Sequence, residues 1–207
     1  MLDNKGFDMW ADGYDASVGL SDNDKKYPFA GYKNILNFIY DDVVLRNCRK
    51  IFDIGFGTAI LSSKLYEKGI DVYGQDFSTE MVKIAKEKMP NAKLFCKDFS
   101  NGVAQELKNT KYDAIIATYS LHHLMDNEKV IFINELLELL CDEGIIYIGD
   151  VAFNTANELE KCRTDSGDEW DDEEFYFVYE ELKKHYNNSE FIKISHCAGV
   201  IKIYGIK

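Results

Sequence analysis

From about residue 49, short apolar runs alternate with segments that carry apolar residues at helical spacing. Apolar runs of about four to eight residues indicate buried strands, and apolar positions three and four apart indicate one face of a helix. Ser78 is a good helix N-cap, while Gly69 and Pro90 stand where helices commonly stop. The first two predicted strand–helix units are 50–55 with 59–69 and 71–77 with 78–90.

The alternation continues to residue 150. The later predicted strands cover 92–99, 112–120 and 143–150, with a short helical stretch over 101–108 and a helix over 127–140. Strands that alternate with helices form a parallel sheet with right-handed crossovers and helices on both faces. The predicted fold class is therefore α/β, a Rossmann-like doubly wound, mostly parallel seven-stranded sheet.

The N-terminal part of the chain has a different character. Residues 1–46 carry helical patterns and several aromatic side chains, among them Trp10 and Tyr14. We expect this part to form an N-terminal helical cap that covers a sheet edge or a crevice.

The C-terminal part begins with an acidic run, 165–175, and a predicted helix over 178–186. Two strand-like stretches follow it. Gly, Ala and similar small residues between such stretches favour a turn, so we predict a C-terminal antiparallel hairpin with Ala198 and Gly199 at its turn.

The composition of the chain restricts its possible functions more than it restricts its possible folds. The chain has 207 residues, of which 46% are hydrophobic, and this suits one domain over residues 1–207. The formal net charge of −12 opposes binding to a phosphate backbone, so we expect no nucleic-acid partner. We also expect no membrane partner, because no stretch approaches the roughly 18 apolar residues of a span. Five cysteines without a C-x-x-C pair, and no signal-peptide pattern, predict reduced thiols and a cytoplasmic protein.

A glycine turn joins the first predicted strand to the first predicted helix. Such a turn presents backbone N–H groups at a helix N-terminus, facing the crevice where α/β sheets bind nucleotide-like ligands. A dinucleotide fingerprint that starts at Gly55 needs a third small residue at position 60, which is Ile60. The turn therefore favours a ligand other than NAD.

The stretch "DIGFGTA", residues 53–59, matches the pattern acidic-x-Gly-x-Gly-x-Gly except for Ala59 in the last position. With "VYGQDFSTEM", "CKDF" and "YDAIIATYSLHHL" in this order and spacing, residues 50–150 closely resemble the class I S-adenosylmethionine-dependent methyltransferases. Residues 1–46 also resemble the cap of small bacterial members of that family. The resemblance implies S-adenosyl-L-methionine as cofactor, and it divides the domain into a helical cap 1–46, a cofactor-binding core 47–150, and a substrate-side segment with the terminal hairpin 151–207.

The resemblance also implies roles for residues at the ends of the predicted strands. Gly55 and Gly57 would admit the amino-acid part of the cofactor close to the backbone, and Asp53 would order the turn or meet the cofactor's ammonium through water. Asp76 would accept hydrogen bonds from both ribose hydroxyls. Ala59 would crowd the cofactor if its φ is positive, and would be harmless if it is already helical.

The other implied cofactor contacts follow the later strands. Asp98 would accept a hydrogen bond from the adenine amino group, while the backbone of Phe99 reads the neighbouring ring nitrogen. Thr118 and Tyr119 would line the methionine part. The complete set of expected cofactor-binding residues is Tyr14, Asp53, Gly55, Gly57, Asp76, Phe77, Asp98, Phe99, Thr118 and Tyr119.

His122 and His123 are the candidate catalytic residues. One of them would face the active site as a base or an orienting donor, and a buried, hydrogen-bonded histidine is the equal alternative. In-line attack on a sulfonium methyl group needs mainly near-attack positioning, with a base only if the acceptor must lose a proton. The histidines and carboxylates lack ligand spacing along the chain, so we expect no metal site.

The predicted function is methyl transfer to a small molecule, by a monomer or a homodimer. Two alternatives stay open: a non-catalytic S-adenosylmethionine- or S-adenosylhomocysteine-binding regulatory module, and a protein or RNA methyltransferase. A basic face or an added recognition domain would favour a protein or RNA methyltransferase. Damaged ligand motifs would favour a non-catalytic binding module. We expect a neutral or cationic acceptor to bind above Thr118 and Tyr119. We expect the acidic run to be a solvated loop or to screen the charge of a cationic substrate. The aromatic residues expected around the acceptor are Trp10, Tyr14, Phe153, Trp170, Phe175 and Tyr176.

Overall fold

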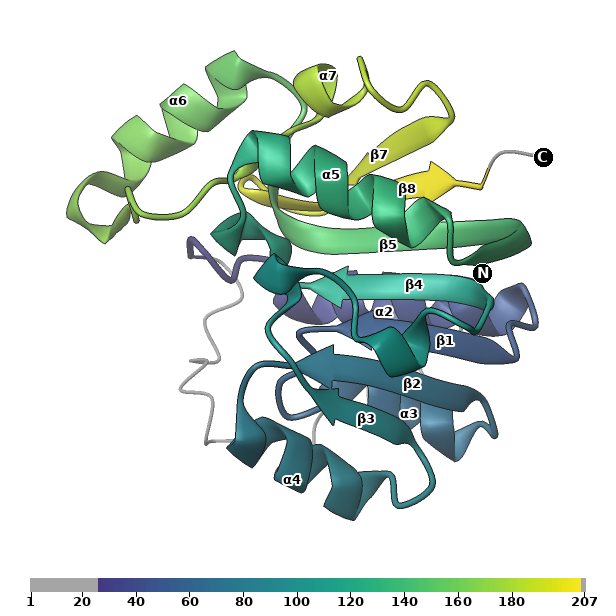
Figure 1. Ribbon diagram of the computed structural model, residues 1–207. Coiled ribbons are helices and arrows are strands. Elements are labelled where there is room, and N and C mark those ends of the chain that lie inside the picture. The colour runs from purple at the N-terminus through teal and green to yellow at the C-terminus, as the bar shows by residue number, and fades with distance from the viewer. Residues whose placement is uncertain (1–25, 206–207) are drawn as a thin grey trace.

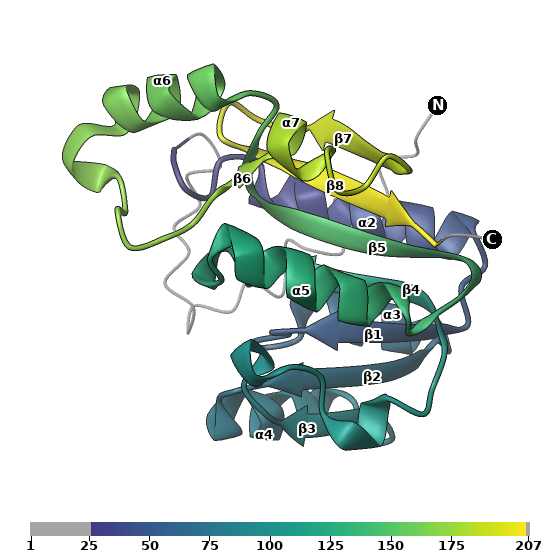
Figure 2. The same ribbon diagram turned by 45° about the horizontal axis from the view of Figure 1, so that its top comes forward.

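The computed structural model describes residues 26–205, which form a mixed β-sheet with helices on both faces (Figure 1, Figure 2). The strands are β1 (Lys50–Ile54), β2 (Asp71–Asp76), β3 (Lys93–Cys96), β4 (Tyr112–Thr118), β5 (Leu140–Phe153), β6 (Phe177–Val178), β7 (Ser189–Lys193) and β8 (Ala198–Tyr204). The α-helices are α2 (Tyr32–Leu45), α3 (Ile60–Glu67), α4 (Thr79–Lys88), α5 (Asp126–Leu137), α6 (Ala156–Ser166) and α7 (Tyr179–Leu182). The short 3₁₀ helices are η2 (Phe99–Asn101), η3 (Gln105–Leu107), η4 (Leu121–His123) and η5 (Gly167–Glu169).

The sheet has the strand order β3-β2-β1-β4-β5-β8-β7. Strands β1 to β5 pair in parallel, while β8 is antiparallel to both β5 and β7. The short strand β6 pairs with the end of β5 beside this path. The predicted α/β class, the mostly parallel sheet and the antiparallel C-terminal pair are confirmed.

The two faces of the sheet carry separate hydrophobic cores. Side chains of α2, α3 and α4 pack on one face, and side chains of α5, the 3₁₀ turns and α7 pack on the other. Figure 1 shows α5 in front of the sheet and α2 and α3 behind it. Successive strand residues serve alternate cores: Ile116 contributes to the first, and Ile115 and Ala117 to the second. Strands buried on both faces explain the continuous apolar runs of the sequence.

The predicted helix boundaries of the core agree with local chemistry. The side chain of Ser78 accepts a hydrogen bond from the Met81 amide at 3.3 Å, which caps α4. Gly69 has φ 83° just beyond α3, a conformation that glycine adopts without strain. These signals are local, and the sequence was sufficient to find them.

The predicted turn of the hairpin was wrong. Ala198 and Gly199 belong to β8, where Gly199 pairs with Asp150 on one side and Lys193 on the other. A Cβ at Gly199 would lie 2.4 Å from the ring of Phe191, so this glycine permits close strand packing. The turn lies four residues earlier, over 194–197, where the Ser195 hydroxyl accepts hydrogen bonds from two following amides.

The segment after β5 also differs from expectation. Helix α6 was not predicted, α7 is shorter than the predicted 178–186, and residues 101–108 form 3₁₀ turns rather than one helix. Of the predicted cap only residues 26–46 are described, and there α2 packs across the sheet face with Ile35, Ile39 and Val43 fully buried. No helix among residues 26–205 is both long and apolar enough to span a membrane.

Candidate functional site

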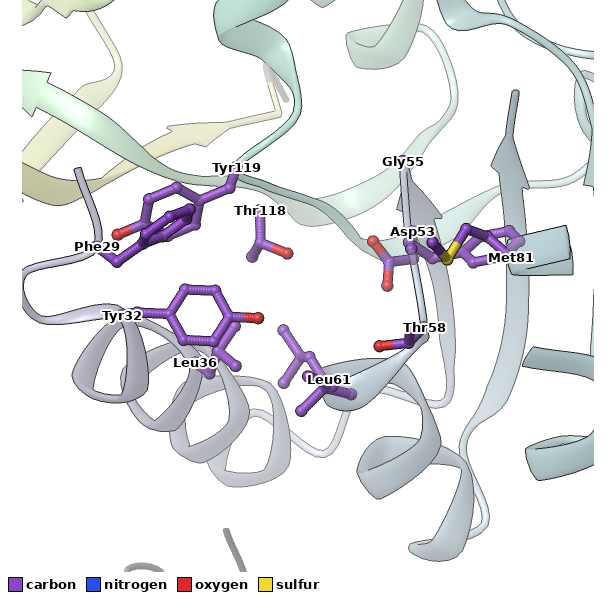
Figure 3. A pocket seen from close by; sticks show the side chains of 13 residues that line it. Phe29, Tyr32, Leu36, Asp53, Gly55, Thr58, Leu61, Met81, Thr118 and Tyr119 are labelled. Carbon is purple, nitrogen blue, oxygen red and sulfur yellow. The ribbon is translucent and has the colours of Figure 1, made fainter. Parts of the chain in front are cut away.

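A cavity of about 240 Å³ opens at the carboxyl end of β1, between β2 on one side and β4 on the other. The order of the strands reverses here, and α/β sheets bind ligands beyond the strands at such a switch point. Figure 3 shows side chains from α2, the glycine turn and the end of β4 converging on it. The lining residues are Phe29, Tyr32, Leu36, Asp53, Gly55, Phe56, Gly57, Thr58, Ile60, Leu61, Met81, Thr118 and Tyr119.

Three alternate residues of the glycine turn are left-handed: Gly55 at φ 64°, Gly57 at φ 53° and Ala59 at φ 60°. A Cβ on Gly55 would lie 2.7 Å from the Cβ of Ser120, so this glycine is required for packing. Within the described part of the chain, a Cβ on Gly57 would meet no atom within 4 Å, so this glycine leaves space among these residues at the pocket wall. Of the two alternatives for Ala59, the positive φ is the one observed.

Asp53 contributes a buried carboxylate to the pocket. Its side chain accepts a hydrogen bond from the Ser62 hydroxyl through Oδ2, while Oδ1 is buried without a hydrogen-bond partner among the described residues. Burial raises the pKa of Asp53 to about 7, and the negative charge of Asp76 adds to this effect. An unpartnered acceptor beside an open glycine suits a ligand that brings a hydrogen-bond donor or a positive charge.

Asp76, at the end of β2, ties the glycine turn to the start of α4. Its Oδ2 accepts a hydrogen bond from the Gly57 amide at 2.8 Å, and its Oδ1 accepts one from the Ser78 amide at 2.9 Å. Asp76 is not among the residues that line the cavity, but its side chain is hydrogen-bonded to Gly57, which does line it. Its expected contact with ribose hydroxyls stays a prediction.

Three further expected cofactor residues lie around the same end of the sheet. The ring of Phe77 is 68% exposed, which leaves an apolar face free beside Asp76. Asp98 caps η2 by accepting a hydrogen bond from the Ser100 amide at 2.8 Å. The ring of Phe99 is buried against Phe132, so only its backbone is left for a ligand. Their contacts with adenine stay predictions.

Thr118 and Tyr119 line the pocket, as expected from their place at the end of β4. Tyr119 has φ 48°, and its ring lies 5.7 Å from that of Phe29 and 5.2 Å from that of Tyr32. The three rings give the pocket an aromatic end opposite the glycine turn (Figure 3). Sequence reasoning did not single out Phe29, because no local motif marks it, and Tyr14 lies outside the described residues.

His122 lies between two carboxylates. Its Nδ1 is 2.7 Å from Oδ1 of Asp150, and its Nε2 is 3.0 Å from Oε2 of Glu174. Burial alone would lower the pKa of His122, but the negative charges of Asp150 and Glu174 and the hydrogen bond that the ring donates to Asp150 outweigh it and raise the pKa. His122 is thus a half-buried, partnered histidine, and its expected catalytic role stays a prediction.

His123 is more exposed, and its Nδ1 lies 3.3 Å from Oε1 of the same Glu174. Sequence reasoning missed both carboxylates of this cluster. Asp150 ends the predicted strand 143–150, a position that could have drawn notice, since strand ends in such sheets face ligands. Glu174 belongs to the acidic run, where nothing distinguishes it from its exposed neighbours.

Most of the aromatic residues expected around an acceptor pack against each other instead of lining the cavity. Trp170 stacks on Tyr27 with ring centroids 5.1 Å apart and meets Tyr176 edge-on at 4.9 Å. Phe153 is fully buried beside the same indole, and Phe175 is exposed. Their expected role at the acceptor stays a prediction.

Comparison with known proteins identifies the family. A family model described as a methyltransferase domain matches residues 51–144. An uncharacterized methyltransferase of Bacillus mycoides is 37% identical over 155 residues, which cover 75% of this chain and 70% of the relative. The chain belongs to the methyltransferase family. The predicted membership in a methyltransferase family is thereby confirmed, with methyl transfer as the reaction.

Solved structures of other methyltransferases share the fold. Magnesium protoporphyrin IX methyltransferase from Synechocystis, crystallised with S-adenosylhomocysteine, gives a TM-score of 0.69 at 19% identity over 98% of this chain and 95% of that one. CalS10, an amino pentose methyltransferase from Micromonospora echinaspora bound to S-adenosylmethionine, gives 0.67 at 10% identity over 94% and 98%. The acceptors of these two enzymes differ, so the fold of this methyltransferase leaves its acceptor open.

Proposed function

We propose that this methyltransferase binds S-adenosylmethionine along the glycine turn and transfers its methyl group to a small molecule bound toward the aromatic end of the same pocket. The observation that carries the proposal is Asp53, whose Oδ1 is buried without a hydrogen-bond partner among residues 26–205 and which lines the same cavity as Gly57. A buried carboxylate oxygen without a donor is costly, and the ammonium of the methionine part would supply one directly or through water. The residues present therefore fit this cofactor.

The bound cofactor supplies an electrophilic methyl group on a positively charged sulfur. The chain's own residues would hold and orient it: Asp53 would accept a donor from the amino-acid part, and Asp76, which lies beside Gly57, would accept the ribose hydroxyls next to the Gly57 amide it already holds. Thr118 lies between the glycine turn and the aromatic end (Figure 3), and the methyl group would face the acceptor near it. Positioning of this kind supplies most of what in-line transfer needs.

The aromatic end of the pocket favours a small acceptor. Phe29, Tyr32 and Tyr119 offer apolar surface in a space of limited size, which suits a compact molecule with an apolar part. The net charge of −12 disfavours polyanions such as RNA.

The cofactor assignment is tested by isothermal calorimetry with S-adenosylmethionine, S-adenosylhomocysteine and NAD. We expect both adenosyl ligands to bind and NAD not to bind. Comparable affinity for NAD would contradict the assignment.

The acceptor assignment is tested by transfer of a labelled methyl group to three panels: small amines, phenols and thiols; cellular RNA; and cellular protein. We expect label only in the first panel. Phe29→Ala should then raise the KM for the acceptor while the cofactor Kd stays unchanged. Phe38→Ala is the matched control, because Phe38 is also half-buried but does not line the pocket. Label in RNA or protein alone would overturn the proposal.

A further inference from the structure

The cluster at the end of β4 and β5 contains the donor atoms of a metal centre. Among residues 26–205, ligand atoms of His122, His123 and Glu174 all lie within 4.8 Å of one another. They come from η4 and from the segment that precedes β6, and the packing of that segment brings them together. Two imidazoles and one carboxylate, with further positions left for water or substrate, are a donor set of catalytic zinc and iron sites.

Asp150 contacts His122 in the way that a carboxylate contacts the far ring nitrogen of a metal-bound histidine. Its side chain is 1% exposed, and its Oδ1 lies 2.7 Å from Nδ1 of His122 and 2.8 Å from the Val151 amide nitrogen. A hydrogen bond that Nδ1 donates to Asp150 fixes the ring and directs Nε2 toward Glu174. Metal-binding histidines commonly donate their other N–H to a carboxylate in this way.

Glu174 supplies a second, independent indication. Its Oε2 is buried and has no hydrogen-bond partner within the described part of the chain, although Nε2 of His122 is 3.0 Å away. The two atoms are close without the alignment of a hydrogen bond. The other oxygen, Oε1, lies 3.3 Å from Nδ1 of His123. A cation bound between these three side chains would satisfy the buried oxygen.

We propose that His122 Nε2, His123 Nδ1 and a carboxylate oxygen of Glu174 bind one divalent transition-metal ion of the zinc type, with Asp150 as the positioning residue behind His122. Imidazole nitrogen with a single carboxylate favours such ions over magnesium or calcium, which prefer all-oxygen sites. The sequence offered no sign of the site, since Glu174 lies far downstream of the two histidines.

The place of the site suggests its use. His122 follows Tyr119 by three residues, and Tyr119 lines the methyl-transfer pocket. The open positions of the metal would bind an oxygen or nitrogen of the acceptor and favour its deprotonated form. This use rests on the proposed function, whereas the binding of the metal does not.

The test uses the full-length protein, stripped of metal with a chelator and titrated with Co²⁺, with visible absorption and calorimetry as readouts. We expect one equivalent to bind. His123→Ala and Glu174→Gln should weaken binding at least about tenfold through loss of a ligand, and Asp150→Asn by about 10- to 100-fold. His185→Ala and His196→Ala, which change exposed histidines outside the cluster, should leave the affinity unchanged.

The outcome does not depend on methyl transfer, because neither the cofactor nor an acceptor is present in the titration. His123 is 57% exposed on its side chain, so His123→Ala is expected to melt like the parent and to separate ligand loss from unfolding. The proposal is wrong if the parent binds no Co²⁺, or if His123→Ala and Glu174→Gln bind it as tightly as the parent. The cluster would then be a metal-free ion-pair network.

Discussion

The two sides of the crevice are built in different ways. The side that we propose for the cofactor consists of one short stretch, residues 53–59, closed by Asp76 through backbone amides. The side that we propose for the acceptor combines Phe29 and Tyr32 from the N-terminal part with side chains that follow β4 and β5. A site made from one local stretch is visible in a sequence, whereas a site made from distant segments is visible only after folding.

The two sides also differ in how their charges are satisfied. On the cofactor side Asp53 is buried with one oxygen that has no hydrogen-bond partner among the described residues, and Ala59 adopts a left-handed conformation that alanine rarely takes. On the acceptor side Oε2 of Glu174 is likewise buried without a hydrogen-bond partner there, but both ring nitrogens of His122 face carboxylates. The difference is that the carboxylates of the acceptor side share a histidine, whereas the buried carboxylate of Asp53 accepts a hydrogen bond from the Ser62 hydroxyl. Four measurements test this contrast, beginning with the largest expected effect.

Gly55→Ala and Gly57→Ala should separate packing from binding. The new Cβ of Gly55→Ala would meet Ser120 at 2.7 Å at a positive φ, so we expect a loss of about 2–4 kcal/mol of stability. Gly57→Ala carries only the conformational cost of about 1–2 kcal/mol, but its methyl group enters the pocket and should abolish cofactor binding. Urea unfolding and calorimetry check both. Equal losses of stability in the two variants would contradict the separation of a packing role for Gly55 from a binding role for Gly57.

Asp53→Asn should abolish a decrease in the free energy of unfolding that the parent protein shows as pH rises. The pKa of Asp53 is about 7 in the folded protein and about 4 in the unfolded chain, so between these values the folded state holds the extra proton. Stability of the ligand-free parent should therefore fall as pH rises from about 5 to about 7, by about 2–3 kcal/mol from this group. Asp53→Asn should lack this fall and be the more stable protein at pH 8, while binding the cofactor more weakly.

Urea unfolding of parent and variant at several pH values checks the prediction. A difference between the two proteins that is independent of pH would contradict it. Asp71→Asn, at the exposed start of β2, is the matched control and should leave the pH profile of the parent unchanged.

Asp76→Ala should weaken cofactor binding at least about tenfold, because hydrogen bonds to a charged group contribute about 1.5–3 kcal/mol each. Asp98→Ala should weaken it less, since one adenine contact is lost and the Phe99 backbone remains. Asp71→Ala serves as the control on the same strand as Asp76. Calorimetry gives the three affinities, and a larger effect at Asp98 than at Asp76 would reverse the assignment of ribose and adenine.

Ala59→Gly should give the smallest change, a gain of about 0.5–1 kcal/mol. Relief of the left-handed alanine contributes about 1–2 kcal/mol, and the greater freedom of glycine in the unfolded chain offsets part of it. Ala156→Gly, at an exposed helical position, should instead lose stability. Thermal melting compares the two variants. A loss of stability in Ala59→Gly would show that the packing of the Ala59 methyl group stabilises the fold by more than its left-handed conformation costs.

Much of the fold was predictable because its signals are local. The alternation of apolar runs and helical patterns predicted β1 to β5 with the helices between them, and Ser78 and Gly69 predicted helix boundaries. The hairpin turn was misplaced because Gly199 reads as a turn residue in sequence, while the ring of Phe191 above it explains its presence in a strand. Helix α6 was missed because only Cys162 of its eleven residues is buried, which leaves no apolar stripe.

The order of residues along the chain was enough to identify a methyltransferase, because Gly55 and Gly57 adopt a backbone geometry that a few neighbours determine, just after the carboxylate of Asp53. Tertiary structure decided which side chains face one another across the crevice. Glu174 is one acidic residue in a run of many, and only the packing of its segment against η4 brings it within 3.0 Å of His122. Contacts between distant segments depend on how the whole sheet and its connections pack, and no short motif carries that information.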